Sequence, residues 1–388
     1  MSEKVVSDDD FQEILGGLRE FIAEKVIPRE REIAENDEIP ADLREAAKDL
    51  GLFGYAIDEE WGGIGLDIVQ QTELGIELGY TSLAFRSMFG TNNGIAGQVI
   101  SGFGTDTQKQ KWLADIASGE VVASFALTES GAGSNPASMR TKAVKTDGGW
   151  SITGEKRYIT NAPNAHLFIT FAKAVDENGE GKVEVFLVPS DSAGVTVGPH
   201  DKKMGQSGAW TADVHFNEVK VSDDALVGGE RGVGYKAAMT SLAKGRITIA
   251  ALAVGQAQRA LDESLAYAAV AQQGGELIGN FQLVQAMLAD QRVGVSAGRS
   301  LVMDTARNYQ NGSDTRVGPS VAKLFCTEMV SKVADLGVQI HGGAGYIREY
   351  PVEQIYRDVR LLRLYEGTSE IQRLIIGANL MKQQTAMA

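Results

Sequence analysis

The chain has 388 residues, including 45 glycines and 8 prolines, and this length predicts two or three compact units with a large core. Its 37 lysines and arginines stand against 51 aspartates and glutamates, which gives a formal net charge of -14. That sign argues against nucleic acid as a partner, although a few local Arg and Lys side chains can still hold an anionic small molecule. Cys326 is the only cysteine, which excludes an intrachain disulfide and a cysteine metal cluster, so we expect a cytoplasmic protein.

The N-terminal residues show neither the charged-then-apolar pattern of an export signal nor the Arg-rich pattern of a transit peptide. No apolar run approaches the ~18 residues that cross a bilayer. Even the Ala-rich stretch at 247–254 is soon followed by the polar residues Gln256 and Gln258. We therefore expect a soluble protein without a membrane partner.

In chain order, the first expected element is an amphipathic helix at 11–22, whose apolar residues recur at helical spacing before Pro28 stops the pattern. Similar helical patterns continue to about residue 122. From about 124 to 224, short β-branched runs alternate with Gly, Asp and Asn clusters, which is typical of an antiparallel sheet with hairpins. Helical spacing then returns near Gly234. The pattern predicts an α+β fold with an N-terminal helical domain (1–123), a middle antiparallel β domain (124–233) and a C-terminal helical bundle (234–388).

Generic catalytic motifs do not explain the chain. Its paired glycines at 131–133 and 342–345 lack the strand, G-x-G-x-x-G turn and helix of a dinucleotide-binding unit. The sequence has no G-x-x-x-x-G-K-[ST] phosphate loop and no G-x-S-x-G nucleophile elbow. Its four histidines show no metal-ligand spacing, so we expect no metal site.

Four segments carry the functional information. They read FALTESGAGS at 125–134, KRYITN at 156–161, LAKGR at 242–246, and QIHGGAGY, YPVE, RD and YEGTSEIQ between 339 and 372. A glycine-rich loop such as the first lets backbone amides approach a planar or anionic ligand, although taken alone it can also be an ordinary turn. Together, in their order and spacing, the four segments resemble the acyl-CoA dehydrogenase family over nearly the whole chain.

The resemblance implies FAD-dependent dehydrogenation of a short- to medium-chain acyl-CoA to 2-enoyl-CoA. Glu366 falls on the position of the family's catalytic base, whereas the alternative role for a Glu at this point is to start a helix. Because a thioester carbonyl acidifies the Cα proton, one carboxylate can remove it while hydride leaves Cβ for flavin N5. The Glu366 N–H is the expected donor to the enolate oxygen. Burial should raise the pKa of the Glu366 carboxyl.

The same resemblance assigns the binding residues. Thr160 is expected near flavin N5, and Tyr158 stands where Trp usually covers the flavin ring, with ordinary sheet packing as its alternative role. The residues expected to bind FAD are Phe125, Leu127, Thr128, Ser134, Tyr158, Ile159, Thr160, Gln282, Gln339, Gly342, Gly343, Thr368 and Glu370. Those expected to bind substrate are Arg86, Ser134, Arg246, Tyr365 and Gly367.

Several positions depart from the family pattern. Ser130 replaces a Pro, Ala243 replaces an Asp that contacts CoA, and Gly245 lies where some relatives place their base. Ala271 and Gly274 replace an Arg and a Phe that in relatives reach the FAD of a neighbouring subunit. Because the Arg is a charge-assisted donor to the FAD diphosphate, we expect this chain to retain FAD less well.

Arg86 is relevant to the acyl tail of the substrate. Its position resembles the one at which glutaryl-CoA dehydrogenases carry an Arg that faces this tail. It is expected either to clamp a carboxylate or polar tail, or to pair with a nearby acid or lie exposed on its helix. The family also implies electron-transferring flavoprotein as electron acceptor and a homotetramer. The alternatives are an acyl-CoA oxidase, a monooxygenase of the same fold, which the presence of Glu366 disfavours, and a flavin-poor partner subunit of a mixed assembly.

Overall fold

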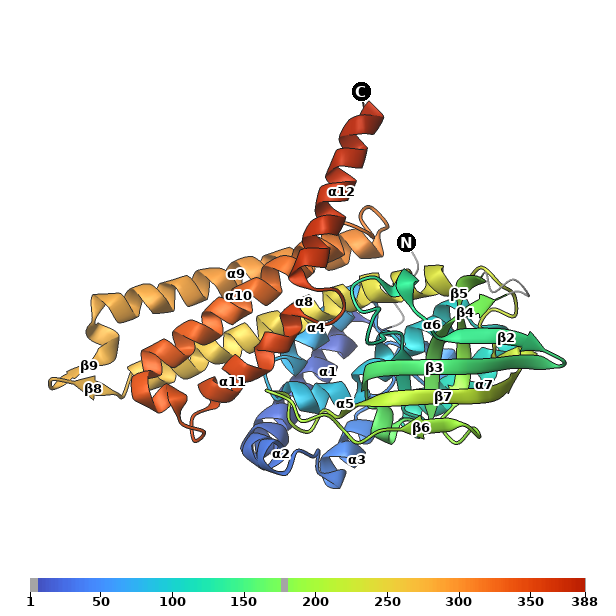
Figure 1. The fold of residues 1–388 in the computed structure, drawn as a ribbon. Coiled ribbons are helices and arrows are strands. Elements are labelled where there is room, and N and C mark those ends of the chain that lie inside the picture. Colours follow the sequence, from blue (N-terminus) through green and yellow to red (C-terminus); the bar gives the residue numbers. More distant parts are fainter. Residues whose placement is uncertain (1–5, 176–180, 388) are drawn as a thin grey trace.

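The computed structural model describes residues 6–175 and 181–387 and has three parts: an N-terminal group of helices, a curled β-sheet and a long helical bundle (Figure 1). This arrangement confirms the predicted α+β fold. The predicted boundaries after residues 123 and 233 stay predictions. The first part contains helices α1 (Asp8–Phe21), α2 (Glu30–Asn36), α3 (Ala41–Asp49), α4 (Ile68–Leu78), α5 (Leu83–Asn93), α6 (Gly97–Phe103) and α7 (Asp106–Ser118).

Pro28 does not stop the first helical segment as the sequence spacing predicts. The helix α1 ends at Phe21 and passes through a π turn (Ile22–Val26) into a 3-10 turn (Ile27–Arg29) that contains Pro28. Proline is tolerated at the start of such a turn, where its missing N–H has no intrahelical acceptor. The chain therefore continues in helical form into α2.

The middle part is one seven-stranded sheet. Its strands are β1 (Ala123–Ala126), β2 (Lys142–Thr146), β3 (Gly149–Thr160), β4 (Leu167–Val175), β5 (Gly181–Pro189), β6 (Val195–Val197) and β7 (Thr211–Ser222). The order is β1-β4-β2-β3-β7-β6, and β5 pairs with β4. Most pairings are antiparallel, but β1 and β2 both run parallel to β4. Residue alternation indicates which face a side chain occupies and not the direction of the neighbouring strand, so the sequence pattern missed these two pairings.

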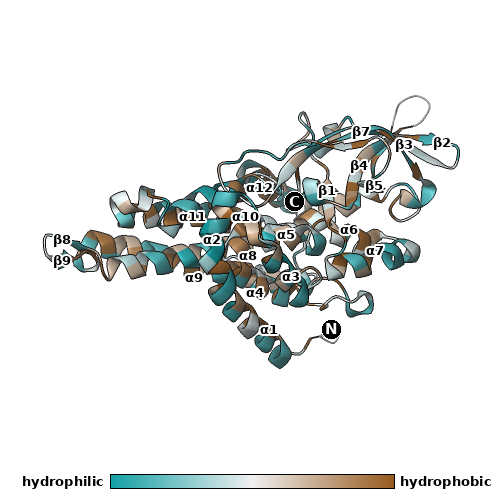
Figure 2. Ribbon diagram, turned by 90° about the horizontal axis from the view of Figure 1, so that it is seen from below, coloured by the Kyte–Doolittle hydropathy of each residue, from teal (hydrophilic) through white to brown (hydrophobic). Residues whose placement is uncertain are grey.

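The C-terminal part is built on α8 (Gly234–Ala268), which packs against α4, α9 (Gln282–Gln310) and α10 (Gly318–His341). Its length and composition would allow it to cross a membrane, but 72% of its apolar window is buried inside the protein, as in a core helix. Most helices carry both hydrophilic and hydrophobic stretches (Figure 2). A short hairpin of β8 (Gln272–Gln273) and β9 (Glu276–Leu277) joins α8 to α9, and α11 (Pro351–Val359) precedes α12 (Ser369–Met387), which projects from the body (Figure 1).

A buried ion pair fixes the glycine-rich loop to the sheet. Lys156, on β3, is fully buried, and its Nζ donates to Glu129 Oε1 at 2.7 Å and to the Leu127 carbonyl at 3.1 Å. The second carboxylate oxygen of Glu129 accepts from the backbone N–H of Arg140. Burial alone would raise the pKa of Glu129, but the charge of Lys156 and these hydrogen bonds outweigh it and lower that pKa. Both ends of the loop between β1 and β2 are thereby held against β3.

We expect Lys156→Met to lower the free energy of unfolding by about 3–5 kcal/mol, because it leaves the buried Glu129 carboxylate without its cation. The matched control is Lys145→Met, which removes a lysine of the same sheet whose ion pair with Asp223 is half exposed. Its expected cost is about 0–1 kcal/mol. Thermal or urea unfolding of the two variants measures the difference, and equal losses would contradict a stabilising role for the buried pair.

Candidate active site

A cavity of about 410 Å³ lies where the three parts of the fold meet. Its walls come from α5, the loop after β1, the end of β3, the 198–210 loop, α8 and the segment before α12. It brings together most of the residues that the sequence selected. Those lining it are Arg86, Phe125, Leu127, Thr128, Ser134, Tyr158, Ile159, Thr160, Arg246, Tyr365, Glu366 and Gly367.

One wall has the form expected for the face of a flat ring. The pairing of β3 with β7 is irregular between Lys156 and Ile159, and Tyr158 in this bulge has a φ of 58°. The bulge turns the Tyr158 side chain out of the sheet, so 61% of its surface is exposed and the Arg157 guanidinium lies over its ring at 5.0 Å. Ordinary sheet packing, the alternative role for Tyr158, is therefore wrong.

Glu366 lines the same cavity and lies on a strained turn. Its φ is 52° and that of the following Gly367 is 91°, a conformation that side chains rarely adopt. Two side chains hold the turn by hydrogen bonds to its backbone carbonyls. Gln372 Nε2 donates to the carbonyls of Glu366, at 3.2 Å, and Gly367, at 2.9 Å, and Lys323 Nζ donates to the Gly367 carbonyl at 2.8 Å. The turn presents the carboxylate to the cavity.

The absence of a side chain at Gly245 makes room for Glu366. A Cβ at position 245 of α8 would lie 2.0 Å from Glu366 Oε2, well inside van der Waals contact. Gly245 cannot act as a base itself. Its contribution is that the carboxylate of Glu366 can approach α8 closely.

The electrostatic setting of Glu366 is unusual for a carboxylate. Its Oε2 is buried and has no hydrogen-bond partner among the described residues. Burial raises the pKa of Glu366, and the nearby cations Arg86, Arg246 and Lys323 oppose that rise without cancelling it. Among the described residues the Nε atoms of Arg86 and Arg246 are likewise buried without partners. Unpaired polar atoms of both signs around one cavity indicate a site prepared for a polar ligand.

Arg86 is neither exposed on its helix nor paired with an acid, the alternatives left open by the sequence. It is 9% exposed, and no carboxylate lies within 4 Å of it in the described ranges. Its guanidinium folds over Gly90, where an added Cβ would lie 2.7 Å from Nη1. The charge of Arg86 faces the cavity near Tyr365 and Glu366.

The sequence analysis missed the loop at 198–210, although this loop closes the cavity. Gln206 has a φ of 53° and is 2% exposed; its N–H donates to the buried Asp358 carboxylate, and its Nε2 donates to the Asp358 carbonyl at 3.1 Å. Burial raises the pKa of Asp358 to about 6. At the other end of the loop, Gly208 N donates to Asp37 at 2.7 Å. The loop thus connects the first helices to α11. In the sequence only its glycines indicate an unusual turn, and the positive φ of Gln206 is visible only in the structure.

A second hollow of about 830 Å³ adjoins the cavity along α8 and α12 and shares Tyr235, Met239 and Arg246 with it. Lys236 and Arg316 add positive charge to its lining, and neither was selected from the sequence. Ala243 lies in the same lining. The hollow therefore lacks a carboxylate at the position where the family places Asp.

The remaining predicted FAD residues do not line the cavity. Glu370 is exposed and Thr368 half-buried just after Gly367, where Thr368 Oγ1 accepts from the Ile371 N–H at 3.4 Å. The others, Gln282, Gln339, Gly342 and Gly343, are exposed at the end of the bundle that carries the β8–β9 hairpin. Tyr267, just before that hairpin, stacks on His341 at 4.2 Å, so the end of α8 lies beside the end of α10.

The residues present fit FAD in the main cavity. The glycine-rich loop is fixed by Lys156, the exposed ring of Tyr158 offers a flat contact, and hydroxyls of Thr128 and Thr160 lie in the lining. Glu366 faces the same space. Residues 6–175 and 181–387 contain no group of three or more His, Cys, Asp and Glu side chains placed to hold a metal ion.

Comparison with known proteins gives a consistent picture. Models of the N-terminal, middle and C-terminal domains of acyl-CoA dehydrogenase match residues 8–120, 124–219 and 232–381. The probable acyl-CoA dehydrogenase YngJ of Bacillus subtilis is 36% identical over 371 residues, which cover 94% of this chain and 96% of YngJ. CarC, a subunit of the caffeyl-CoA reductase-Etf complex of Acetobacterium woodii, is 35% identical over 367 residues, with coverage of 94% and 96%.

Among solved structures, butyryl-CoA dehydrogenase from Megasphaera elsdenii matches with a TM-score of 0.92 at 31% identity, over 97% of this chain and 99% of that one. The matched domain models together span most of the chain. The chain therefore belongs to the acyl-CoA dehydrogenase family, whose members are FAD-dependent oxidoreductases.

Proposed function

We propose that this protein dehydrogenates a short- to medium-chain acyl-CoA to the 2-enoyl-CoA, with Glu366 as the base that removes the α-proton. The observation that carries the proposal is the Glu366 carboxylate itself. It lines the same cavity as Tyr158 and Thr160, and its Oε2 has no partner in the described part of the chain. A helix-start residue would instead direct its carboxylate to the backbone N–H groups of its own helix.

The chain's own residues supply proton transfer and orientation. FAD, when bound, supplies the hydride acceptor. A raised pKa lets Glu366 accept a proton at neutral pH better than an exposed carboxylate would, because it brings proton affinity toward the working pH. In this proposal the Glu366 N–H donates to the thioester oxygen, where negative charge grows as the proton leaves. The strained turn, fixed by Gln372 and Lys323, holds both groups in one position.

The hollow beside the cavity suits the CoA portion of the substrate. It continues from Arg246 along α8 toward Lys236 and Arg316, so a thioester at Glu366 would extend its anionic end past cationic side chains. This local charge opposes the overall charge of -14. The missing Asp at Ala243 removes one contact expected there.

The first experiment is an anaerobic titration of the purified protein with butyryl-, octanoyl-, isobutyryl- and glutaryl-CoA, monitored at the oxidised flavin band. We expect one of them to bleach the band, and Glu366→Gln to slow bleaching by at least about 1000-fold because the base is lost. Gly245→Ala should also slow it, since its Cβ would displace the carboxylate. Unchanged bleaching in Glu366→Gln would exclude Glu366 as the base. A protein that stays colourless with added FAD would favour a partner subunit.

Arg86 supports a finer proposal, that the preferred acyl tail is polar or carries a carboxylate. The buried Arg86 guanidinium has a hydrogen bond with the Tyr55 side chain, but its Nε has no partner and no carboxylate of the described residues lies within 4 Å, so it can still take an anionic or hydrogen-bonding group. Its charge also acts on Glu366, so the tail it would bind is short.

We expect Arg86→Met to lower kcat/KM for glutaryl-CoA about 10- to 100-fold relative to kcat/KM for butyryl-CoA, the range of one charge-assisted contact. The ratio is measured at a pH where Glu366 is fully ionised in both proteins, because loss of the Arg86 charge also raises the Glu366 pKa. An unchanged ratio for mono- and dicarboxylic acyl groups would refute the clamp.

We further propose electron-transferring flavoprotein as the acceptor, a homotetrameric assembly and a cytoplasmic location. The similarity to CarC, a subunit of a reductase-Etf complex, supports the first. The exposed predicted FAD residues at the hairpin end support the second, because they do not line the cavity that Glu366 lines and are free to contact the FAD of another subunit. Oxygen consumption with substrate would instead favour an oxidase.

FAD retention tests the contact between subunits. The hairpin tip has Gly274 at φ 63° and Gly275 at φ 87°, as a tight two-residue turn requires, so a Phe at position 274 would be strained. We therefore expect Ala271→Arg alone to raise the fraction of FAD retained after dialysis, whereas Gln273→Arg, in the same hairpin, controls for added charge. Full flavin in the unmodified protein after extensive dialysis would show that the missing Arg is compensated elsewhere.

A further inference from the structure

Lys323 is a buried lysine next to the turn that carries Glu366, and the proposed mechanism gives it no role beyond holding that turn. It lies on α10 and is 0% exposed, and no carboxylate of the described residues is within 4 Å of its Nζ. Its hydrogen bond goes to the Gly367 carbonyl, at 2.8 Å, on the turn that carries Glu366. An ammonium group is costly to bury without a carboxylate partner, so this placement calls for a function.

The bond ties α10 to the strained turn. Because Glu366 and Gly367 both have positive φ, the peptide between them needs support to hold its orientation. Gln372, which is also fully buried, donates to the same Gly367 carbonyl, but it belongs to the helix that follows the turn. Among residues 6–175 and 181–387, only Lys323 ties the turn to a different helix through this carbonyl.

The charged groups around Glu366 come from several elements. Arg86 on α5, Arg246 on α8 and Lys323 on α10 all act on its carboxylate, and the partly buried Tyr365 adjoins it in the chain. Lys323 in turn faces the acids Glu328 and Glu370 beside Glu366. Glu328 is already engaged by Ser369 Oγ at 2.6 Å and Arg363 Nη1 at 3.1 Å, and Glu370 is exposed.

We propose that Lys323 is a positioning residue that holds the Glu366–Gly367 turn and keeps the Glu366 carboxylate ionised near neutral pH. The proposal rests on Glu366 acting as the base. Removing the lysine charge leaves the desolvation of Glu366 less opposed, so its pKa rises further. Burial lowers the pKa of Lys323 itself to about 8. Above that pH the unmodified protein also begins to lose the lysine charge that opposes the desolvation of Glu366.

The test compares Lys323→Met with Lys323→Gln. Methionine removes both the charge and the hydrogen-bond donor, whereas glutamine removes the charge and keeps an amide that can donate. The first readout is the pH dependence of kcat/KM for butyryl-CoA. We expect the acid limb to move to higher pH by about one unit in both variants, because a neighbouring cation is lost. At the plateau we expect a lower kcat in Lys323→Met than in Lys323→Gln.

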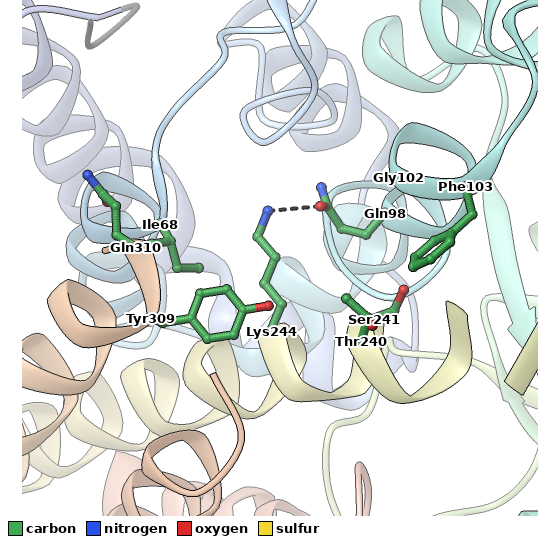
Figure 3. Close-up of a pocket in the computed structure, with 9 residues that line it drawn as sticks. All are labelled: Ile68, Gln98, Gly102, Phe103, Thr240, Ser241, Lys244, Tyr309 and Gln310. Carbon is green, nitrogen blue, oxygen red and sulfur yellow. Dashed lines mark hydrogen bonds between the residues drawn. The ribbon is translucent and has the colours of Figure 1, made fainter. Parts of the chain in front are cut away.

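A matched control comes from another lysine, which is partly buried. Lys244 lies on α8 but does not line the cavity of Glu366; it lies in a separate hollow of about 290 Å³, where its Nζ donates to Gln98 Oε1 at 2.8 Å (Figure 3). Burial lowers its pKa to about 8 as well. We expect Lys244→Met to leave the acid limb in place, since Lys244 does not act on Glu366.

The second readout needs no turnover. The infrared band of protonated Glu366, identified by its loss in Glu366→Gln, is titrated in the holoenzyme without substrate. We expect its midpoint to move up in both Lys323 variants and to stay fixed in Lys244→Met. Flavin content and thermal unfolding show that each variant is folded, and Lys323→Gln decides the question if Lys323→Met does not fold.

The outcomes separate the two proposals. An acid limb and an infrared midpoint that stay at the unmodified protein's pH in the Lys323 variants would overturn the role of Lys323. Bleaching that survives in Glu366→Gln would overturn the role of Glu366 as base, while the infrared midpoint would still report whether Lys323 controls its proton. A shift in Lys244→Met as large as that in Lys323→Gln would show a general effect of charge and refute a specific one.

Discussion

The arrangement of the site depends on burying the Glu366 carboxylate while leaving it able to ionise. Glu366 is buried enough to raise its pKa, and three cations oppose that rise. They come from α5, α8 and α10, so neither the N-terminal helices nor the bundle alone could create the site. Because the energy of an unpaired buried charge is large, the positions of these helices and the ionisation of Glu366 depend on each other. The cavity at the junction of the three parts is the result.

Backbone segments around this cavity are fixed by buried polar contacts more than by regular secondary structure. Lys156 and Glu129 fix the glycine-rich loop, and the N–H of Gln206 fixes the 198–210 loop to Asp358. The catalytic turn is held by Gln372 and Lys323. In each case a side chain from one element satisfies the backbone or carboxylate of another. Loops with satisfied polar groups can be as well defined as a helix, which a reacting group requires.

The departures from the family pattern fall at the edges of the site. Gly245 is part of the arrangement, because its missing side chain gives Glu366 its space. Ala243 removes a carboxylate from the lining of the hollow proposed for CoA. Ala271 and the glycine turn at 274–275 lie at the far end of the bundle. The proposed chemistry at Glu366 and the proposed contact that retains FAD therefore lie in separate parts of the fold.

The sequence by itself determined the α+β architecture and the family and selected Glu366 as the candidate base, because helical and strand periodicities and closely spaced motifs are local properties of the chain. Most of the residues selected around the flavin and the base do share one cavity. Tertiary structure alone decided the parallel pairings of β4, the solvent exposure of Tyr158 and the burial of Arg86 with its Nε unpaired. It also decided that Lys323, Lys156 and Gln206 are buried and hydrogen-bonded to segments around the cavity. Lysines and glutamines are ordinarily exposed, and only long-range packing buries them against a particular carbonyl or carboxylate.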